Sequence, residues 1–176
     1  MLVDPKNLEK DLNDFGKYVV QQARANLTRK NKNVSKELYD SIQYDLRSSG
    51  SGVSFSLDFK MEEYGEFQDK GVSGVKRKYN TPYKYTNKRP PAKVFDKWMV
   101  RRGLDGIRDE QGRFIPRKSL AFIIANSVYN KGIKPSYFFT RAFTLGFKRL
   151  PQEVREAFQL DVQEFLEFTL KNNFKE

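Results

Sequence analysis

The sequence IQYDLRSSGSGVSFSLDFKM at residues 42–61 alternates apolar and polar side chains on both sides of a turn rich in serine and glycine. Successive side chains of a β-strand point to opposite faces, so this pattern is typical of a hairpin with one buried face. We predict two strands joined at residues 48–52. The residues of the apolar face are Ile42, Tyr44, Leu46, Val53, Phe55, Leu57, Phe59 and Met61.

A long helix is predicted before the hairpin. Apolar residues recur there at spacings of three and four, which places them on one face of a helix. Asp4 and Pro5 are typical of a helix start, and the polar residues 28–33 end the pattern. The apolar stripe comprises Leu8, Leu12, Phe15, Val19, Ala23 and Leu27.

Two short segments flank the hairpin. Residues 35–39 are expected to form a short helical turn, and residues 64–67 a further extended stretch that closes at Gly71 and Gly74. The sequence GVSG at residues 71–74 is similar to the Gly-x-x-Gly loop of some RNA-binding domains. A turn is the favoured interpretation, because the helix pattern that surrounds such a loop is missing.

Three further helices are expected toward the C-terminus. One begins at Pro90 and ends at Gly103, and a second starts near Pro116. Ser136 is expected to cap a third helix, which continues past a bend at Pro151. The fold class is therefore α+β, a small antiparallel β-sheet with flanking N- and C-terminal helices and a basic, partly helical insertion.

The chain contains neither cysteine nor histidine. Disulfides, thiolate nucleophiles and cysteine-ligated metals are therefore excluded, and the commonest general base is missing. No apolar run approaches the ~18 residues that a membrane span needs, and the N-terminus lacks the pattern of a secretory signal. We expect a soluble protein, made in a cytoplasm, with no catalytic residues, no metal site and no cofactor.

The net charge of +11 is concentrated in the middle of the chain. Residues 70–118 contain 15 basic and 4 acidic residues, whereas the rest of the chain carries 18 of each sign. A local basic excess indicates an acidic partner, either nucleic acid or an acidic protein surface. We predict a single domain over residues 1–176, with residues 75–131 as a basic insertion within it.

Four stretches carry a family resemblance through their order and spacing: ARANL at residues 23–27, SKELYDSI at 35–42, YGEFQDKGV at 64–72 and KPSYFFTRA at 134–142. In this order they resemble the tail-completion or neck proteins of tailed bacteriophages. Members of that family have an Ala-rich helix end, a Gly-x-Leu-x-x-Ser-Ile turn, a Tyr-Ala-x-x-Val-Glu-x-Gly-Thr segment and a Pro-x-Pro-Phe-Leu-x-Pro-Ala segment. The resemblance covers about residues 15–72 and 132–172. Ser35 replaces the usual glycine, Gln68-Asp69 replaces the usual glutamate, and the basic insertion has no counterpart.

The resemblance implies a virion structural protein without an active site. Such a protein is a subunit of a ring in the phage neck, joins the capsid portal or adaptor to the tail, and leaves a passage for DNA. The implied partners are further copies of the chain, portal or adaptor proteins and tail proteins, with packaged DNA as an additional candidate and no membrane. The implied location is the virion neck, after assembly in the cytoplasm of the host bacterium.

The basic segment at residues 76–89 has three interpretations. Lysine and arginine neutralise phosphates while tyrosines stack on bases, so a stand-alone nucleic-acid-binding protein is the alternative function. Docking onto acidic surfaces of neighbouring subunits is favoured, and a solvated loop remains open. The candidate residues are Lys76, Arg77, Lys78, Lys84, Lys88 and Arg89.

A third function to consider is a Mg²⁺-dependent nuclease. Asp58 and Lys60 share one face of the predicted strand, and Asp40 or Asp45 would add a second carboxylate. An ordinary solvent-facing side of the strand is the better interpretation, because polar residues alternate with apolar ones there.

Two groups of residues are candidate subunit contacts. Acidic residues follow the hairpin, and contact with a neighbour's basic segment is favoured for them over a divalent-cation site. The C-terminal stretch is acidic, and its apolar residues extend around most of a predicted helix. A single intramolecular contact would not cover so wide an apolar surface. A basic middle and an acidic end make a heterologous pair of surfaces, which a closed ring requires. The candidate interface residues are Glu66, Asp69, Phe158, Phe165 and Phe168.

Overall fold

A computed structural model describes residues 5–48, 55–104 and 106–157. The chain divides into two compact units. Described residues within Met1–Asn33, Glu37–Gly65 and Tyr137–Glu176 belong to the first unit, and those within Val34–Lys36 and Glu66–Ser136 to the second unit.

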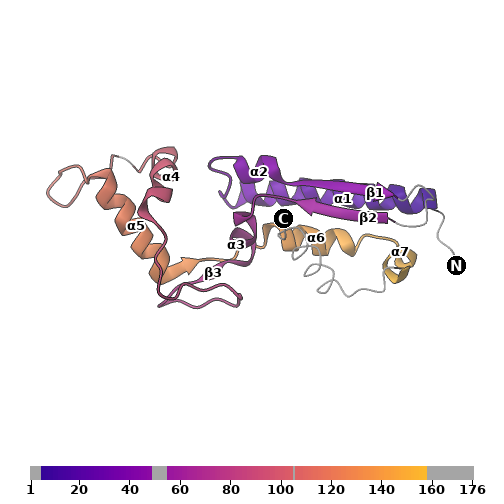
Figure 1. The fold of residues 1–176 in the computed structure, drawn as a ribbon. Coiled ribbons are helices and arrows are strands. Elements are labelled where there is room, and N and C mark those ends of the chain that lie inside the picture. The colour runs from indigo at the N-terminus through magenta and orange to yellow at the C-terminus, as the bar shows by residue number, and fades with distance from the viewer. Residues whose placement is uncertain (1–4, 49–54, 105, 158–176) are drawn as a thin grey trace. The chain divides into compact units, whose positions relative to one another are not determined.

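The first unit is α+β, as predicted (Figure 1). Helix α1 packs along the two-stranded antiparallel sheet and against α6. Its elements are α1 (Pro5–Arg29), α2 (Glu37–Ser41), β1 (Gln43–Ser48), β2 (Phe55–Lys60), α6 (Phe138–Phe147) and α7 (Gln152–Ala157).

The predicted stripe of the N-terminal helix is confirmed. Five of its residues, Leu12, Phe15, Val19, Ala23 and Leu27, are buried. Gly16 extends this face, because a Cβ there would lie 2.5 Å from the ring of Tyr44 on β1. The absence of a side chain at Gly16 therefore lets the helix approach the sheet closely.

The pairing of the two predicted strands is also confirmed, whereas residues 49–54, which include most of the predicted turn and Val53, lie outside the described residues. Strands β1 and β2 pair in an antiparallel register that runs from Gln43 opposite Lys60 to Ser48 opposite Phe55. Phe59 is 2% exposed and faces the core, whereas Lys60 beside it is exposed. The alternation in the sequence thus matches the two faces of the sheet.

A cluster of aromatic rings forms the core of the first unit. Phe143 of α6 lies edge-to-face against Phe15 of α1 at 5.2 Å and against Phe59 of β2 at 5.9 Å. Phe139 contacts the same Phe59 ring at 5.4 Å. These contacts join three segments that are distant in sequence.

Four local predictions are wrong. The helix after Ser136 does not continue past Pro151 but ends at Phe147, before α7 begins, and residues 71–74 contain the strand Val72–Ser73 where a turn was predicted. Residues 64–67 are not extended but begin α3 (Tyr64–Lys70). A Lys70–Glu66 ion pair of 3.0 Å at i,i+4 spacing stabilises this helix, and Gly71, with φ of +77°, ends it. Tyr137, not Ser136, occupies the N-cap position of α6.

The second unit contains the two helices predicted in the basic region. Two very short strands precede and follow these helices. In chain order the elements are β3 (Val72–Ser73), the 3₁₀ helix η1 (Ala92–Phe95), α4 (Asp96–Arg101), α5 (Arg117–Lys131) and β4 (Gly132–Ile133). Gly103, with φ of +66°, follows α4 as predicted. Met99, Leu120 and Ala121 form a small buried core. None of the described helices is long and apolar enough to span a bilayer.

Candidate functional site

The ends of the basic insertion, residues 75–131, are held together by the β3–β4 pair. Val72 pairs with Ile133, and Ser73 pairs with Gly132. Beyond this pair, the backbone amides of Lys76 and Arg77 donate to the carbonyl of Asn130 at 3.0 and 3.1 Å. The chain therefore leaves and re-enters this point through adjacent antiparallel strands, the geometry that an inserted segment requires.

The four residues 71–74 are buried, so they do not form an exposed Gly-x-x-Gly loop. Two glycines make this packing possible. A Cβ on Gly74 would overlap the carbonyl oxygen of Asn130, and a Cβ on Gly132 would overlap that of Val72. The segment is a tightly packed junction.

Ser73 organises the basic loop that follows it, formed by the basic segment at residues 76–89. Its backbone amide donates to the carbonyl of Tyr83 at 2.8 Å, and its carbonyl accepts from the amide of Tyr85 at 2.9 Å. Its hydroxyl donates to the carbonyl of Tyr79 at 3.2 Å and accepts from the Tyr79 amide at 3.0 Å. One residue that is 5% exposed thus fixes the loop at three positions.

Ser73→Ala should loosen this loop without unfolding the unit. The substitution leaves the part-buried amide and carbonyl of Tyr79 without their hydroxyl partner, a loss of about 1–2 kcal/mol. We expect the Tyr79 amide to exchange with deuterium at least tenfold faster. Ser119→Ala, at an exposed position on α5, is the matched control and should change nothing. Unchanged protection of Tyr79 in Ser73→Ala would contradict this role.

The tyrosines of the loop are engaged within the second unit. Tyr83 lies edge-to-face on Phe67 at 4.8 Å, and Tyr85 lies 6.1 Å from Tyr129. Burial, with a hydrogen bond to Glu66, holds the pKa of Tyr83 well above its usual value. Tyr83 and Tyr85 are thus half-buried and in contact with other rings, which leaves less aromatic surface for stacking on bases.

The six candidate basic side chains are exposed. Lys78 Nζ donates to the carbonyl of Gly74 at 2.9 Å, and the guanidinium of Arg77 lies 5.3 Å from the Tyr79 ring. Among the described residues, no carboxylate forms an ion pair with Lys76, Arg77, Lys78, Lys84, Lys88 or Arg89. The loop thus presents uncompensated positive charge on an ordered backbone.

Comparison of this chain with models of known protein families, with curated proteins and with solved structures finds no match. Its function must therefore be inferred from its own residues and their geometry.

The acidic residues predicted as subunit contacts are engaged elsewhere. Asp69 is 3% exposed, so its carboxylate is not presented to a neighbouring subunit, and we exclude it from the candidate interface. Glu66 is 17% exposed and pairs with Lys70, which also weakens its candidacy. Sequence reasoning missed this burial because acidic residues are rarely inside. The other three candidates, Phe158, Phe165 and Phe168, lie outside the described residues.

The nuclease hypothesis depends on carboxylates that the hairpin brings together. Asp45 and Asp58 are directly opposite each other across the strands. Asp45 Oδ2, however, lies 2.8 Å from the guanidinium of Arg47 and 3.9 Å from Lys60 Nζ. No group of three potential metal ligands occurs in the part of the chain that the structure describes. The arrangement resembles a solvent-facing ion-pair cluster.

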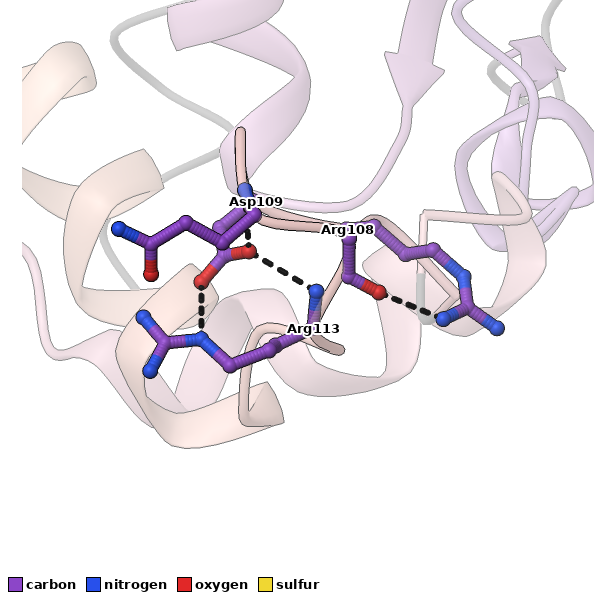
Figure 2. Close-up of polar contacts among 5 residues, drawn as sticks. Arg108, Asp109 and Arg113 are labelled. Carbon is purple, nitrogen blue, oxygen red and sulfur yellow. Dashed lines mark hydrogen bonds and ion pairs between the residues drawn. The ribbon is translucent and has the colours of Figure 1, made fainter.

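The tight turn between α4 and α5 is built on Asp109 (Figure 2). Its carboxylate accepts hydrogen bonds from the amide of Arg113 at 2.9 Å, from the Nε of Arg113 at 3.0 Å and from the amide of Gln111 at 3.0 Å. Arg108 donates to the carbonyl of Gly112 at 2.6 Å. Residues 109–112 therefore form a tight turn, with Gly112 at φ of +78°.

The Asp109 turn should loosen in acid. Hydrogen bonds from the amide and then the side chain of Arg113 lower the pKa of Asp109 below its usual value of about 3.9. Its stabilising contribution is therefore present above that usual value and is lost as the pH falls through the lower folded pKa. Carboxyl ¹³C NMR should show Asp109 titrating below an unfolded-state reference. Arg113→Met removes the Nε donor and should raise the pKa of Asp109 partway toward the reference value. A pKa equal to the reference value in the unchanged chain would contradict the turn geometry.

Proposed function

We propose that this chain is a virion structural protein, a subunit of a ring in the neck of a tailed bacteriophage that joins the capsid portal or adaptor to the tail. One observation carries the proposal. Parts of three stretches that resemble the family, residues 23–27, 37–42 and 137–142, lie together in the first unit, while the basic insertion leaves and returns through the β3–β4 pair.

The packing of two resembling stretches gives specific support. Arg24, in the stretch at residues 23–27, donates to the carbonyl of Tyr39 at 3.0 Å and to that of Ile42 at 2.8 Å. Both acceptors belong to the stretch at residues 35–42. The third contributor is α6, whose Phe138 carbonyl accepts a hydrogen bond of 2.9 Å from Asn26 on α1. The similarity in sequence order thus corresponds to mutual contacts.

The basic loop supports a docking role in this assembly. Its charges are exposed and form no ion pair among the described residues, its backbone is fixed by Ser73, and Tyr83 and Tyr85 are half-buried in contact with other rings. An ordered charged surface loses little conformational entropy on binding. We propose that it meets acidic surfaces of neighbouring subunits and that the chain has no catalytic role.

A genetic interruption tests the proposed location. An amber codon early in the gene should yield DNA-filled heads and separate tails in the lysate, because the joining ring is missing. Supplying the chain from a plasmid should restore joined particles. Complete, infectious particles that lack the chain would contradict the proposal.

The alternative function, nucleic-acid binding through residues 76–89, is favoured by the same six exposed cations. A triple variant distinguishes the two functions. It combines Lys76→Ala, Arg77→Ala and Lys78→Ala in one chain. We expect the triple variant to stay folded and to lose neck assembly. The charge-matched control combines Lys10→Ala, Lys17→Ala and Lys148→Ala at exposed positions of the first unit and should assemble normally. Normal assembly of the first variant, with loss of salt-sensitive DNA binding alone, would favour the alternative.

A further inference from the structure

Helix α5 carries two apolar faces. Leu120, Ala121 and Ala125 are buried against the rest of the second unit. Phe122 and Ile123 point the other way and are 51% and 54% exposed. A surface helix needs a single apolar face to pack on its own unit, so the face that carries Phe122 and Ile123 is not needed for folding.

The outer face of α5, defined here by Ser119, Phe122, Ile123 and Asn126, follows helical spacing of three, four and seven residues. All four residues are exposed. Its centre is therefore aromatic and aliphatic, and its ends are small or polar. Such a stripe is the form in which one helix presents itself to another apolar element.

A guanidinium accompanies the aromatic ring on this face. Arg89 lies 4.4 Å from the centroid of the Phe122 ring and is itself exposed. The same combination recurs in the second unit, where Arg108 lies 3.8 Å from the ring of Phe114, which is 62% exposed. A partner for such a surface needs apolar side chains with carboxylates between them.

The chain itself contains a segment of this chemistry. Residues 158–170 read FQLDVQEFLEFTL, with three acidic residues, no basic residue and three phenylalanines. They lie outside the described residues, so their sequence alone enters the comparison. Their apolar residues match the outer face of α5, and their carboxylates match Arg89 and the basic excess around it.

We propose that the outer face of α5 binds residues 158–170 of a second copy of this chain. The contact joins two different surfaces, so each copy offers one face and one segment, and repetition yields a ring or an open chain of subunits. This inference rests on the proposed function, because it names the contact between copies. It is tested on the isolated chain in solution, where it can fail while the neck location stands.

Cysteine cross-linking tests the contact directly, because the chain has no cysteine of its own. One preparation carries Ser119→Cys and the other carries Gln163→Cys, both at polar positions that leave the apolar contacts intact. After mixing and treatment with a short bismaleimide, peptide mapping should find residue 119 linked to residue 163. Only a contact between copies can form that link. The Ser119→Cys/Gln163→Cys double variant is treated in the same way. A link that forms only within monomers of this double variant, or no link at all, overturns the proposal.

Self-association gives an independent readout. Ile123→Glu and Phe165→Glu should each weaken self-association, measured by sedimentation, by at least about tenfold, as expected for central contact residues. Leu145→Glu is the matched control, because Leu145 is an equally apolar helix residue, 45% exposed, in the first unit. It should associate like the unchanged chain.

Mixing the two defective variants provides the sharpest comparison. Each retains one intact surface, so Ile123→Glu and Phe165→Glu should together form a dimer that neither forms alone. An unchanged chain that stays monomeric at every attainable concentration overturns the inference. Copies that associate through other residues, with cross-links elsewhere, overturn it too but leave the neck proposal standing. Binding of a DNA oligonucleotide that Ile123→Glu abolishes, without self-association, would assign this face to nucleic acid instead.

Discussion

Phe143→Ala should lower the free energy of unfolding of the first unit by about 3–5 kcal/mol, the usual cost of removing a buried phenylalanine ring. Phe143 is fully buried and contacts the rings of Phe15, Phe59, Phe139 and Phe147. The substitution leaves a cavity between α1, β2 and α6, whose backbones cannot close it without moving. Chemical denaturation followed by circular dichroism would measure the change.

Leu145→Ala is the control for this prediction. Leu145 lies two residues further along α6 and is 45% exposed, so its truncation should change the free energy of unfolding by about 0.5 kcal/mol or less. The comparison holds the helix and the type of change constant and varies burial. Equal effects of the two substitutions would contradict the assignment of Phe143 to the core.

Gly132→Ala should destabilise the junction at the base of the basic insertion by about 3 kcal/mol or more. Gly132 has φ of 72° and ψ of −169°, a conformation that is essentially restricted to glycine. A Cβ there would also overlap the carbonyl oxygen of Val72 and lie 2.5 Å from the amide nitrogen of Gly74. We expect the amides of Lys76 and Arg77, which bond across this junction, to lose their protection from hydrogen exchange.

Gly112→Ala separates backbone strain from crowding. Gly112 also has a positive φ, of +78°, but a Cβ there would meet no atom within 4 Å. Its replacement should cost about 1–2 kcal/mol, the strain of a left-handed alanine alone. If Gly132→Ala were no more damaging than Gly112→Ala, the close approach of β3 to β4 would be wrong.

The elements with strict periodicity could be predicted from the sequence. The stripe from Leu12 to Leu27 repeats over several turns, and the alternation around Phe59 repeats over two strands, so local pattern and tertiary burial agree. The α+β class followed from these two elements. Proline and glycine punctuation located the helices of the second unit, because those residues restrict the backbone directly.

The errors occur where short segments depend on tertiary contacts. Tyr64–Lys70 is too short for its period to be decisive, and its helix depends on the Glu66–Lys70 pair and the positive φ of Gly71. Asp69 is likewise buried, and its backbone carbonyl accepts a hydrogen bond from the amide of the distant Ser136. No local pattern distinguishes such a carboxylate from an exposed one.

The charge of the candidate site could be predicted, but its architecture could not. Counting charges located the basic excess in residues 70–118, which include the basic segment at residues 76–89. The four hydrogen bonds of Ser73 that order the loop join a serine to backbone groups up to 12 residues away, and serine has no preference that predicts them. The outward position of Phe122 and Ile123 was also hidden, because an apolar run of this length fits a fully buried helix equally well.

The most direct test of the neck proposal is to image the intact particle by cryo-electron microscopy at a resolution that allows the chain to be traced. The proposal predicts several copies of the first-unit fold in a closed ring between portal and tail, each with its basic loop against an acidic surface of a neighbouring subunit. A completely traced neck that contains no copy of this chain would contradict it.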